Sequence, residues 1–153
     1  MSDVPQRLDY RQFPSAYAQA LNARPRRNPA MEAAVTENLI PYFNPAVKQA
    51  EGNPRNFGVL SQQVDSPAQA NQVLNQSITN NFLRWQQAGM PGKFVDFMAD
   101  RWAPVGVAND PKNLNKNWTG NVRKSLKNQL GPKAYERWKK LNLVMAPPWG
   151  GTA

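Results

Sequence analysis

The amino-acid sequence predicts an all-α domain, and three kinds of observation support that fold class. Apolar residues recur every three or four positions along much of the chain, and only residues 57–64 have the character of an extended segment. A capping residue stands directly before a proline at four places, where its side chain can accept a backbone N–H and the proline can occupy the first helical position. Glycines follow several of the periodic segments, as they commonly do at helix ends.

The first half of the chain contains three expected helices. Residues 29–40 follow a capping asparagine and end before Pro41, whereas residues 45–51 follow a second asparagine and end before Gly52. The clearest helix covers residues 67–88, with a serine cap in front and a glycine behind. The apolar stripe of this long helix consists of Ala70, Val73, Leu74, Ile78, Phe82 and Trp85.

The second half of the chain contains three further helices. Residues 93–102 place four large apolar side chains on one face: Phe94, Phe97, Met98 and Trp102. Residues 115–130 continue a repeat of apolar residues at every fourth position: Leu114, Trp118, Val122, Leu126 and Leu130. Gly131 ends this helix, and Pro132 opens a last one. The expected inner side of the last helix consists of Tyr135, Trp138 and Leu141.

These elements form one small helical domain over residues 28–143, with a segment outside it at each end. Residues 1–27 contain three prolines and are expected to form an extended N-terminal arm, although residues 15–22 could be helical. Residues 144–153 are expected to form an irregular C-terminal tail that could dock on a neighbouring molecule through Trp149.

Composition excludes several classes of protein. The 153 residues suffice for one domain, and they include no cysteine and no histidine. Disulfide scaffolds, zinc sites with the usual ligands, cysteine nucleophiles and histidine bases are therefore excluded, and no metal or cofactor is expected. No apolar run is long enough to span a membrane. Because charged residues stand among the first ten, no secretory signal peptide is expected.

Positive charge is concentrated near the C-terminus. The net charge is +9, and residues 111–153 hold nine basic residues against one acidic residue, which gives this segment +8. Such a segment can bind nucleic acid, an anionic membrane surface or an anionic cell-wall polymer. The alternative is an ordinary solvated helix surface. The residues expected to contact a polyanion are Lys116, Arg123, Lys124, Lys127, Lys139 and Lys140.

Glu51 is the residue best placed for catalysis. It would end a short helix, where the negative end of the helix dipole disfavours an ionised carboxylate and raises its pKa. A carboxylic acid that stays protonated near neutral pH can protonate the leaving oxygen when a glycosidic bond is cleaved. The alternative is an exposed acidic residue at a helix end, paired with Lys48 or Arg55.

The segment around Glu51 resembles a known family. Residues 51–54 read E-G-N-P and residues 58–62 read G-V-L-S-Q, which is similar to the E-S-G-G-N-P … G-L-M-Q pattern of lytic transglycosylases in the lysozyme superfamily. The order of the later motifs, from residues 65–67 through R-W-A-P at 101–104 to Asn109-Asp110, resembles that of phage virion-associated relatives. The similarity covers residues 44–128, with fewer residues between the glutamate and the Asn-Pro loop than those relatives have.

The resemblance implies a lysozyme-like fold and a transglycosylase or lysozyme activity on peptidoglycan, with Glu51 as the general acid and then the base. A hydrolytic variant would need a second carboxylate, for which Asp65 and Asp110 are the candidates, although the sequence favours a turn residue at Asp65 and a helix cap at Asp110. The candidate substrate-binding residues are Asn53, Asn56, Gln62, Trp102 and Asp110. The asparagines and Gln62 could instead bond loop backbone, and Trp102 could belong to the core.

Three interpretations of the whole protein are consistent with these observations. Two of them place the protein in a phage particle, and the third does not. In the first, the protein is assembled into the virion in the host cytoplasm and cleaves peptidoglycan during genome delivery. In the second, it is a non-catalytic virion protein of the head, tail or interior that binds neighbouring virion proteins through its arm and tail, and DNA through its basic C-terminal helices. In the third, it is a stand-alone nucleic-acid-binding protein.

Overall fold

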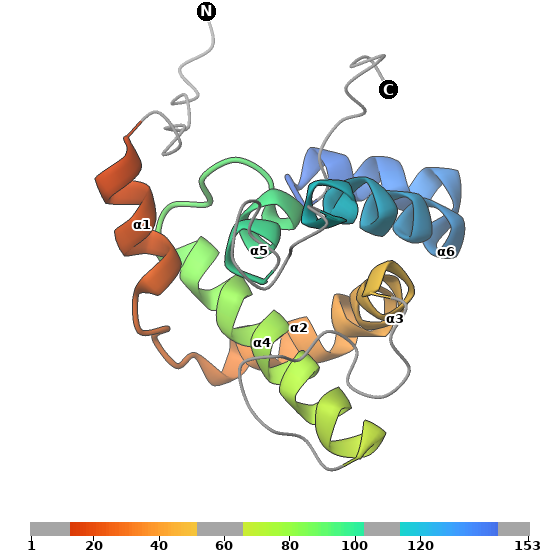
Figure 1. The fold of residues 1–153 in the computed structure, drawn as a ribbon, viewed down its shortest axis with the longest axis horizontal. Coiled ribbons are helices and arrows are strands. Elements are labelled where there is room, and N and C mark those ends of the chain that lie inside the picture. Colours follow the sequence, from red (N-terminus) through yellow and green to blue (C-terminus); the bar gives the residue numbers. More distant parts are fainter. Residues whose placement is uncertain (1–12, 52–65, 103–113, 144–153) are drawn as a thin grey trace, which may run out of the picture.

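A computed structural model describes residues 13–51, 66–102 and 114–143 of the chain (Figure 1). Within these ranges every regular element is helical and no strand occurs, so the all-α class is confirmed. The elements are α1 (Pro14–Asn22), α2 (Pro29–Asn38), α3 (Ile40–Glu51), α4 (Pro67–Gln87), α5 (Phe94–Trp102), a 3₁₀ turn η2 (Leu114–Asn117) and α6 (Trp118–Lys140). The expected extended segment, residues 57–64, lies outside the described residues.

The helices pack around α4 and α5, which lie in the middle of the molecule (Figure 1). Helix α3 makes its most extensive contact with α6, while α1 packs on α4 and α5 from the opposite side. Phe94 of α5 is fully buried at the centre of an aromatic cluster, with its ring centroid 5.3 Å from those of Phe43 and Phe82 and 5.6 Å from that of Trp85. These contacts hold α3, α4 and α5 together at one core.

Two of the expected helix starts are confirmed by their caps. The Asn28 side chain accepts a hydrogen bond from the backbone N–H of Met31 at 3.1 Å, and the Ser66 side chain accepts one from Gln69 at 3.1 Å. The long helix α4 ends as expected before Gly89, whose φ of 85° is the left-handed conformation that favours glycine.

The prediction for Asn44 and Pro45 is wrong. Helix α3 begins at Ile40, so Pro45 lies inside the helix and Asn44 does not cap it. A proline here removes the hydrogen bond to the carbonyl of Pro41, and its ring crowds that carbonyl, so Pro45 opposes the helix. Burial of Phe43 and Val47 against the core stabilises this longer helix.

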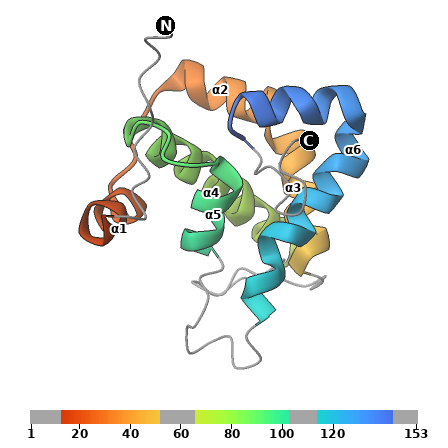
Figure 2. The ribbon, with the colours of Figure 1, turned by 90° about the horizontal axis from the view of Figure 1, so that it is seen from above.

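The two predicted C-terminal helices are the two halves of α6. Gly131 has φ 78° and ψ 168°, which breaks the helix and lets the second half turn away from the first (Figure 2). The predicted stripes are buried at Trp118, Val122, Tyr135 and Trp138. Leu141 is an exception: it follows the last residue of α6 and is 61% exposed, so it does not reach the core.

The N-terminal segment is partly helical. Residues 14–22 form α1, the helix that the sequence allowed from residue 15, and Tyr17 attaches it to α5. The Tyr17 ring contacts Phe97 edge-on at 6.1 Å, and the Tyr17 hydroxyl donates a hydrogen bond to Asp100. Residues 1–12 and the tail with Trp149 lie outside the described residues. None of the helices described is both long enough and apolar enough to cross a membrane.

Candidate functional site

The ends of three helices meet at Glu51. Glu51 is the last residue of α3, Trp102 is the last residue of α5, and Trp118 is the first residue of α6. The indole Nε1 of Trp102 donates a hydrogen bond to Glu51 Oε1 at 3.1 Å, and that of Trp118 donates to the same oxygen at 2.9 Å. The carboxyl group of Glu51 is therefore held by two donors from different parts of the fold.

Helix packing explains why these residues meet. Trp118 is 4% exposed and continues the buried stripe of α6 that contains Val122 and Leu126, so it faces α3. Trp102 is half-buried, and its body packs on the core while its N–H reaches Glu51. An indole is large, apolar and able only to donate, which suits a position with one edge in the core and the other toward a carboxylate.

The geometry determines where a proton on Glu51 would be. A carboxyl oxygen has two lone pairs, and both lone pairs of Oε1 are engaged by the two indole donors. When Glu51 is neutral its proton is therefore on Oε2, the oxygen that no described residue engages. The arrangement makes Oε2 the donating atom of the carboxylic acid.

Burial raises the pKa of the Glu51 carboxyl above its ordinary value, and the hydrogen bonds from Trp102 and Trp118 act in the opposite direction. The raised pKa agrees with the expectation from sequence. Its leading cause differs, because removal of the carboxyl from water outweighs the other influences. A group with this balance can hold a proton and still be stabilised after releasing it.

Two amide networks hold α3 in place beside Glu51. The Ser125 hydroxyl on α6 donates to Gln49 Oε1 at 2.5 Å and accepts from Gln129 Nε2 at 3.0 Å. On another side of α3, the side-chain N–H₂ of Asn44 donates to Asn71 at 3.0 Å and to Asn75 at 2.6 Å, both on α4. These residues were missed as a group by sequence reasoning. For the asparagine network the sequence offers one signal, its 17 asparagines.

Of the predicted substrate-binding residues, the structure describes Trp102 alone. It brings this residue to Glu51, although the ring also packs on the core as the alternative interpretation held. Asn53, Asn56, Gln62 and Asp110 lie outside the described residues, as do Asp65 and Arg55. Among the residues that the structure describes, no group of three or more acidic side chains could hold a metal ion.

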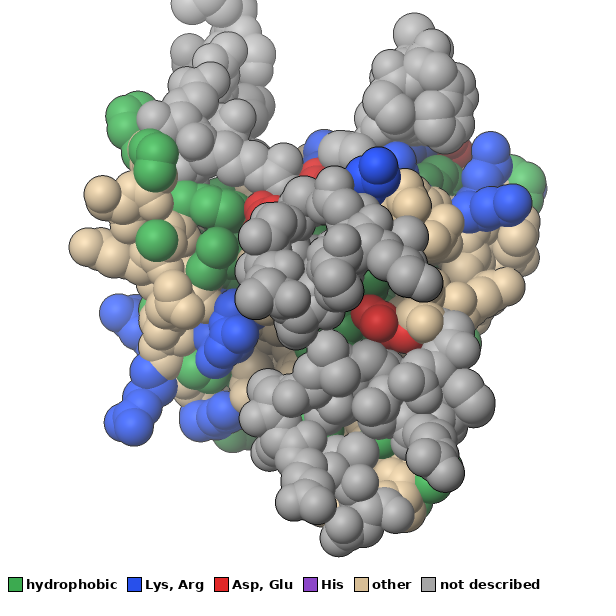
Figure 3. Space-filling model, viewed as in Figure 1, with side chains coloured by type: hydrophobic (Ala, Val, Ile, Leu, Met, Phe, Trp, Pro, Cys, Tyr) green, Lys and Arg blue, Asp and Glu red, His purple; other side chains and the backbone are tan. Residues whose placement is uncertain are grey.

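The predicted polyanion-binding residues separate into two groups. Lys116, Lys124, Lys127 and Lys140 are exposed, and Lys and Arg side chains gather over α6 in the space-filling view (Figure 3). Arg123 and Lys139 turn inward and leave this surface, contrary to the expectation. Arg123 is 8% exposed, and its buried Nη1 has no hydrogen-bond partner among the described residues. Lys139 Nζ lies 2.9 Å from Glu136 Oε1 and 5.7 Å from the centre of the Tyr135 ring.

No protein-family model matches the chain, and no curated protein and no solved structure matches it either. The resemblance to lytic transglycosylases therefore depends on the short motifs alone. The function has to be argued from the arrangement of Glu51, Trp102 and Trp118.

Proposed function

We propose that this protein cleaves the glycan strands of peptidoglycan, with Glu51 as the general acid and base, and that it acts as a component of a phage particle. The observation that carries the proposal is the carboxyl group at the end of α3, whose pKa is raised by burial and whose Oε1 is engaged by two indoles. Oε2, which no described residue engages, is then the oxygen that would donate a proton to a glycosidic oxygen.

The proposed reaction uses the same carboxyl group twice. The Oε2–H of Glu51 protonates the oxygen between two sugars, and the bond from that oxygen to the anomeric carbon breaks. The Glu51 carboxylate then removes a proton from a hydroxyl of the same sugar, and the hydroxyl oxygen bonds to the anomeric carbon. Glu51 is again protonated, no water is consumed, and the product ends in an anhydro sugar.

The two tryptophans suit both steps. Their hydrogen bonds stabilise the carboxylate that forms after the first proton transfer, and they also fix the orientation of the group. One carboxylate is sufficient for this pathway, whereas inverting hydrolysis would need a second one about 6.5–9.5 Å away.

The decisive experiment compares the wild type with Glu51→Gln on purified peptidoglycan. Glutamine retains a carbonyl-type Oε1 for both indoles but cannot transfer a proton, so we expect release of soluble fragments to fall by about 10²- to 10⁴-fold. Glu37→Gln is the matched control, because Glu37 is exposed on α2. Equal release by the wild type and Glu51→Gln would remove Glu51 from the mechanism.

Labelled water separates the two ways of cleaving the bond. In H₂¹⁸O, hydrolysis introduces the heavy oxygen at the new sugar end, whereas closure of the anhydro ring does not. We expect fragments whose mass is lower by one water molecule than that of the corresponding hydrolysis products, and which carry no ¹⁸O. Labelled fragments would indicate hydrolysis and a second catalytic carboxylate.

The second candidate function is that of a non-catalytic virion protein. A specific observation favours it: the bonds from Trp102 and Trp118 to Glu51 join α3, α5 and α6, so the same contact stabilises the fold without any catalysis. This function predicts no fragment release by the wild type and many copies of the protein at one symmetric position in the particle. Quantitative mass spectrometry of purified particles measures that copy number.

A further inference from the structure

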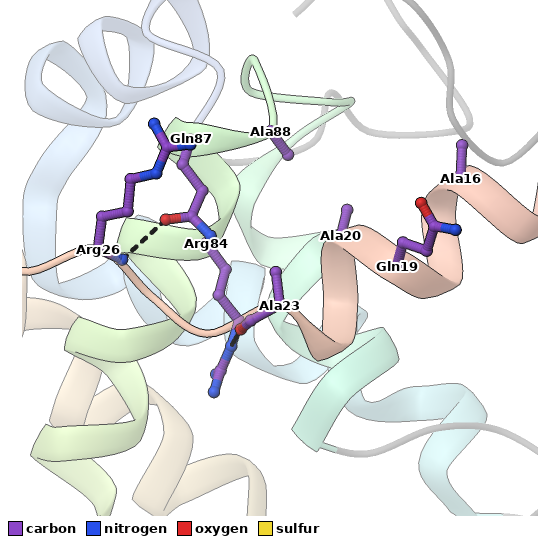
Figure 4. A pocket seen from close by; sticks show the side chains of 8 residues that line it. All are labelled: Ala16, Gln19, Ala20, Ala23, Arg26, Arg84, Gln87 and Ala88. Atoms are coloured by element: carbon purple, nitrogen blue, oxygen red, sulfur yellow. Dashed lines mark hydrogen bonds between the residues drawn. The ribbon is translucent and has the colours of Figure 1, made fainter.

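A groove lies between α1 and α4, on a part of the molecule that shares no lining residue with the Glu51 site (Figure 4). Its volume is about 320 Å³. Helix α1 lines it with Ala16 and Ala20, one turn apart, and Ala23, which directly follows the helix, lines it as well. The opposite wall carries Arg84 and Gln87 of α4, and Arg26 closes one end. Small side chains on one wall and cationic or amide side chains on the other allow an extended polar chain to lie close to the protein.

The segment between α1 and α2 is fixed along this groove through its backbone. Arg84 Nε donates to the carbonyl of Ala23 at 2.7 Å, and Gln87 Nε2 donates to the carbonyl of Arg24 at 3.0 Å. The backbone N–H of Arg26 donates to Gln87 Oε1 at 2.8 Å. Because these bonds use main-chain atoms of the segment, the side chains of Arg24 and Arg26 remain exposed and available to a ligand.

Positive charge accumulates around Arg84. Burial lowers the pKa of its guanidinium, and the neighbouring charges of Arg101 and Arg27 lower it further. Among the described ion pairs, Glu32 compensates Arg27 at 3.2 Å. Basic side chains also gather on this side of the space-filling view (Figure 3). A ligand with negative charge would relieve this repulsion.

The directions of the arginines favour a polymer over a single small anion. Figure 4 shows the guanidinium groups of Arg26 and Arg84 on opposite sides of Gln87, so the two groups do not converge on one point. A chain with a negative charge on every unit could contact both. The exposed guanidinium of Arg26 can bind phosphate in a bidentate manner. Arg84, whose Nε and Nη1 donate to Ala23 and Asn81, contributes its charge.

An exposed aromatic residue stands at the start of α1. Phe13 is 51% exposed and directly precedes the helix, three residues before Ala16 of the groove. A cationic groove next to an exposed aromatic ring is the combination by which proteins bind single-stranded nucleic acid, since phosphates contact the cations and a base stacks on the ring. An acidic polypeptide would use the cations but would gain less from the ring.

We propose that the groove between α1 and α4 binds single-stranded nucleic acid, with phosphates at Arg24, Arg26 and Arg84 and a base stacked on Phe13. This surface is separate from the basic surface of α6, and the proposal is independent of catalysis at Glu51. Contacts to phosphate and to the face of any base predict binding with little dependence on base sequence.

The test is a fluorescence-anisotropy titration of the full chain with a labelled deoxythymidine oligonucleotide at several salt concentrations. The variant Arg24→Gln/Arg26→Gln removes two cations whose side chains make none of the bonds that hold the segment. The matched control, Lys124→Gln/Lys127→Gln, removes two exposed cations from α6. We expect the groove variant alone to reduce the slope of log affinity against log salt by about 1.4, which is about 0.7 for each lost phosphate contact.

The variant Phe13→Ala tests stacking without a change in charge. We expect affinity to fall about 10-fold while the salt dependence stays the same. Circular dichroism establishes that each variant is folded, and the single change Arg26→Gln replaces the double one if the latter unfolds. Equal losses in the groove variant and the α6 variant would overturn the proposal. So would displacement of the oligonucleotide by polyglutamate of the same charge, because that would identify an acidic polypeptide as the ligand.

Discussion

Trp118 Nε1 lies 2.9 Å from Glu51 Oε1, although 67 positions of sequence separate the two residues. This bond joins the end of α3 to the start of α6, which is the pair of helices with the most extensive contact in the described part of the molecule. The carboxyl group proposed to transfer protons is thus also part of what holds the fold together. Substitutions at Glu51 must therefore separate chemistry from stability.

Glu51→Ala and Glu51→Gln should differ in stability. Alanine removes the acceptor and leaves the buried indole N–H of Trp118 without a partner, which should lower the free energy of unfolding by about 1–3 kcal/mol. Glutamine keeps an acceptor oxygen and should cost less. Urea denaturation of both variants measures the difference. Equal stabilities would mean that water replaces the carboxyl group at this position without cost.

The stability contribution of Glu51 should depend on pH. Because its pKa is raised in the folded state, the folded protein holds this proton more tightly than the unfolded chain, whose glutamates titrate near 4.5. Below pH 4.5, Glu51 is protonated in both the folded and the unfolded state, so its ionisation does not lower the free energy of unfolding. As pH rises from 4.5 through the raised pKa, ionisation increasingly destabilises the fold. The free energy of unfolding of Glu51→Gln relative to wild type should therefore rise across this window.

The control for that measurement is Glu37→Gln, analysed by urea denaturation at the same series of pH values. Its difference from wild type isolates the effect of removing one exposed carboxyl group. A difference between wild type and Glu51→Gln that stays constant with pH would contradict the raised pKa.

Removing one indole donor should raise the pKa of Glu51 further. The hydrogen bond from Trp118 favours the ionised carboxylate, so Trp118→Phe deletes a stabilising contact and keeps an aromatic ring. Titration of the Glu51 carboxyl carbon by NMR measures the pKa directly, without any assay of activity. Trp138→Phe is the matched control, because it changes another buried tryptophan of α6 that does not bond Glu51. Equal shifts in both variants would attribute the effect to packing.

Local signals in the sequence were sufficient to predict some helix boundaries and insufficient for others. Asn28 and Ser66 cap helices as predicted, because capping depends on atoms within three residues of the cap. Asn44 stands before a proline in the same way but lies within α3, since burial of its neighbours extends the helix in front of it. Tertiary packing determines where α3 begins, and an Asn-Pro dipeptide contains no information about that packing.

The site was predictable only where it depends on local structure. The position of Glu51 at a helix end follows from the sequence around it, but both of its indole partners are more than fifty residues away. The charge distribution along the sequence did not indicate the arginines of the α1–α4 groove, because the net charge of the first 110 residues is only +1. Folding brings Arg26 and Arg84 to one groove, which a linear count cannot register.

The buried amide of Asn44 should matter for stability. Its side-chain N–H₂ donates to both Asn71 and Asn75, and Asn44 itself is 7% exposed. Asn44→Ala should lower the free energy of unfolding by about 1–3 kcal/mol, because two partly buried carbonyl groups lose their donor. Asn121→Ala, at an exposed position on α6, should change it by less than about 0.5 kcal/mol. Similar losses in the two variants would show that the asparagine network is not the cause.

Two glycines of α6 should respond in opposite ways to replacement by alanine. Gly131 has φ 78° and ψ 168°, a conformation nearly restricted to glycine, and an added methyl group there would meet no atom within 4 Å. Gly131→Ala should therefore destabilise through backbone strain alone, by about 1–3 kcal/mol. Gly120 is helical and exposed, with equally open space, so Gly120→Ala should stabilise by about 0.5–1 kcal/mol.

Thermal unfolding of both alanine variants measures this contrast within one helix. The break at Gly131 lets Tyr135 and Trp138 turn back onto the core, where both are buried. A straight α6 would carry these two side chains away from the other helices. The alanine variant could relieve its backbone strain at position 131 only by straightening the helix, and it would then lose these buried contacts. If Gly131→Ala were as stable as Gly120→Ala, the second half of α6 could adopt a different direction without cost, and the break would not be what places these aromatic residues.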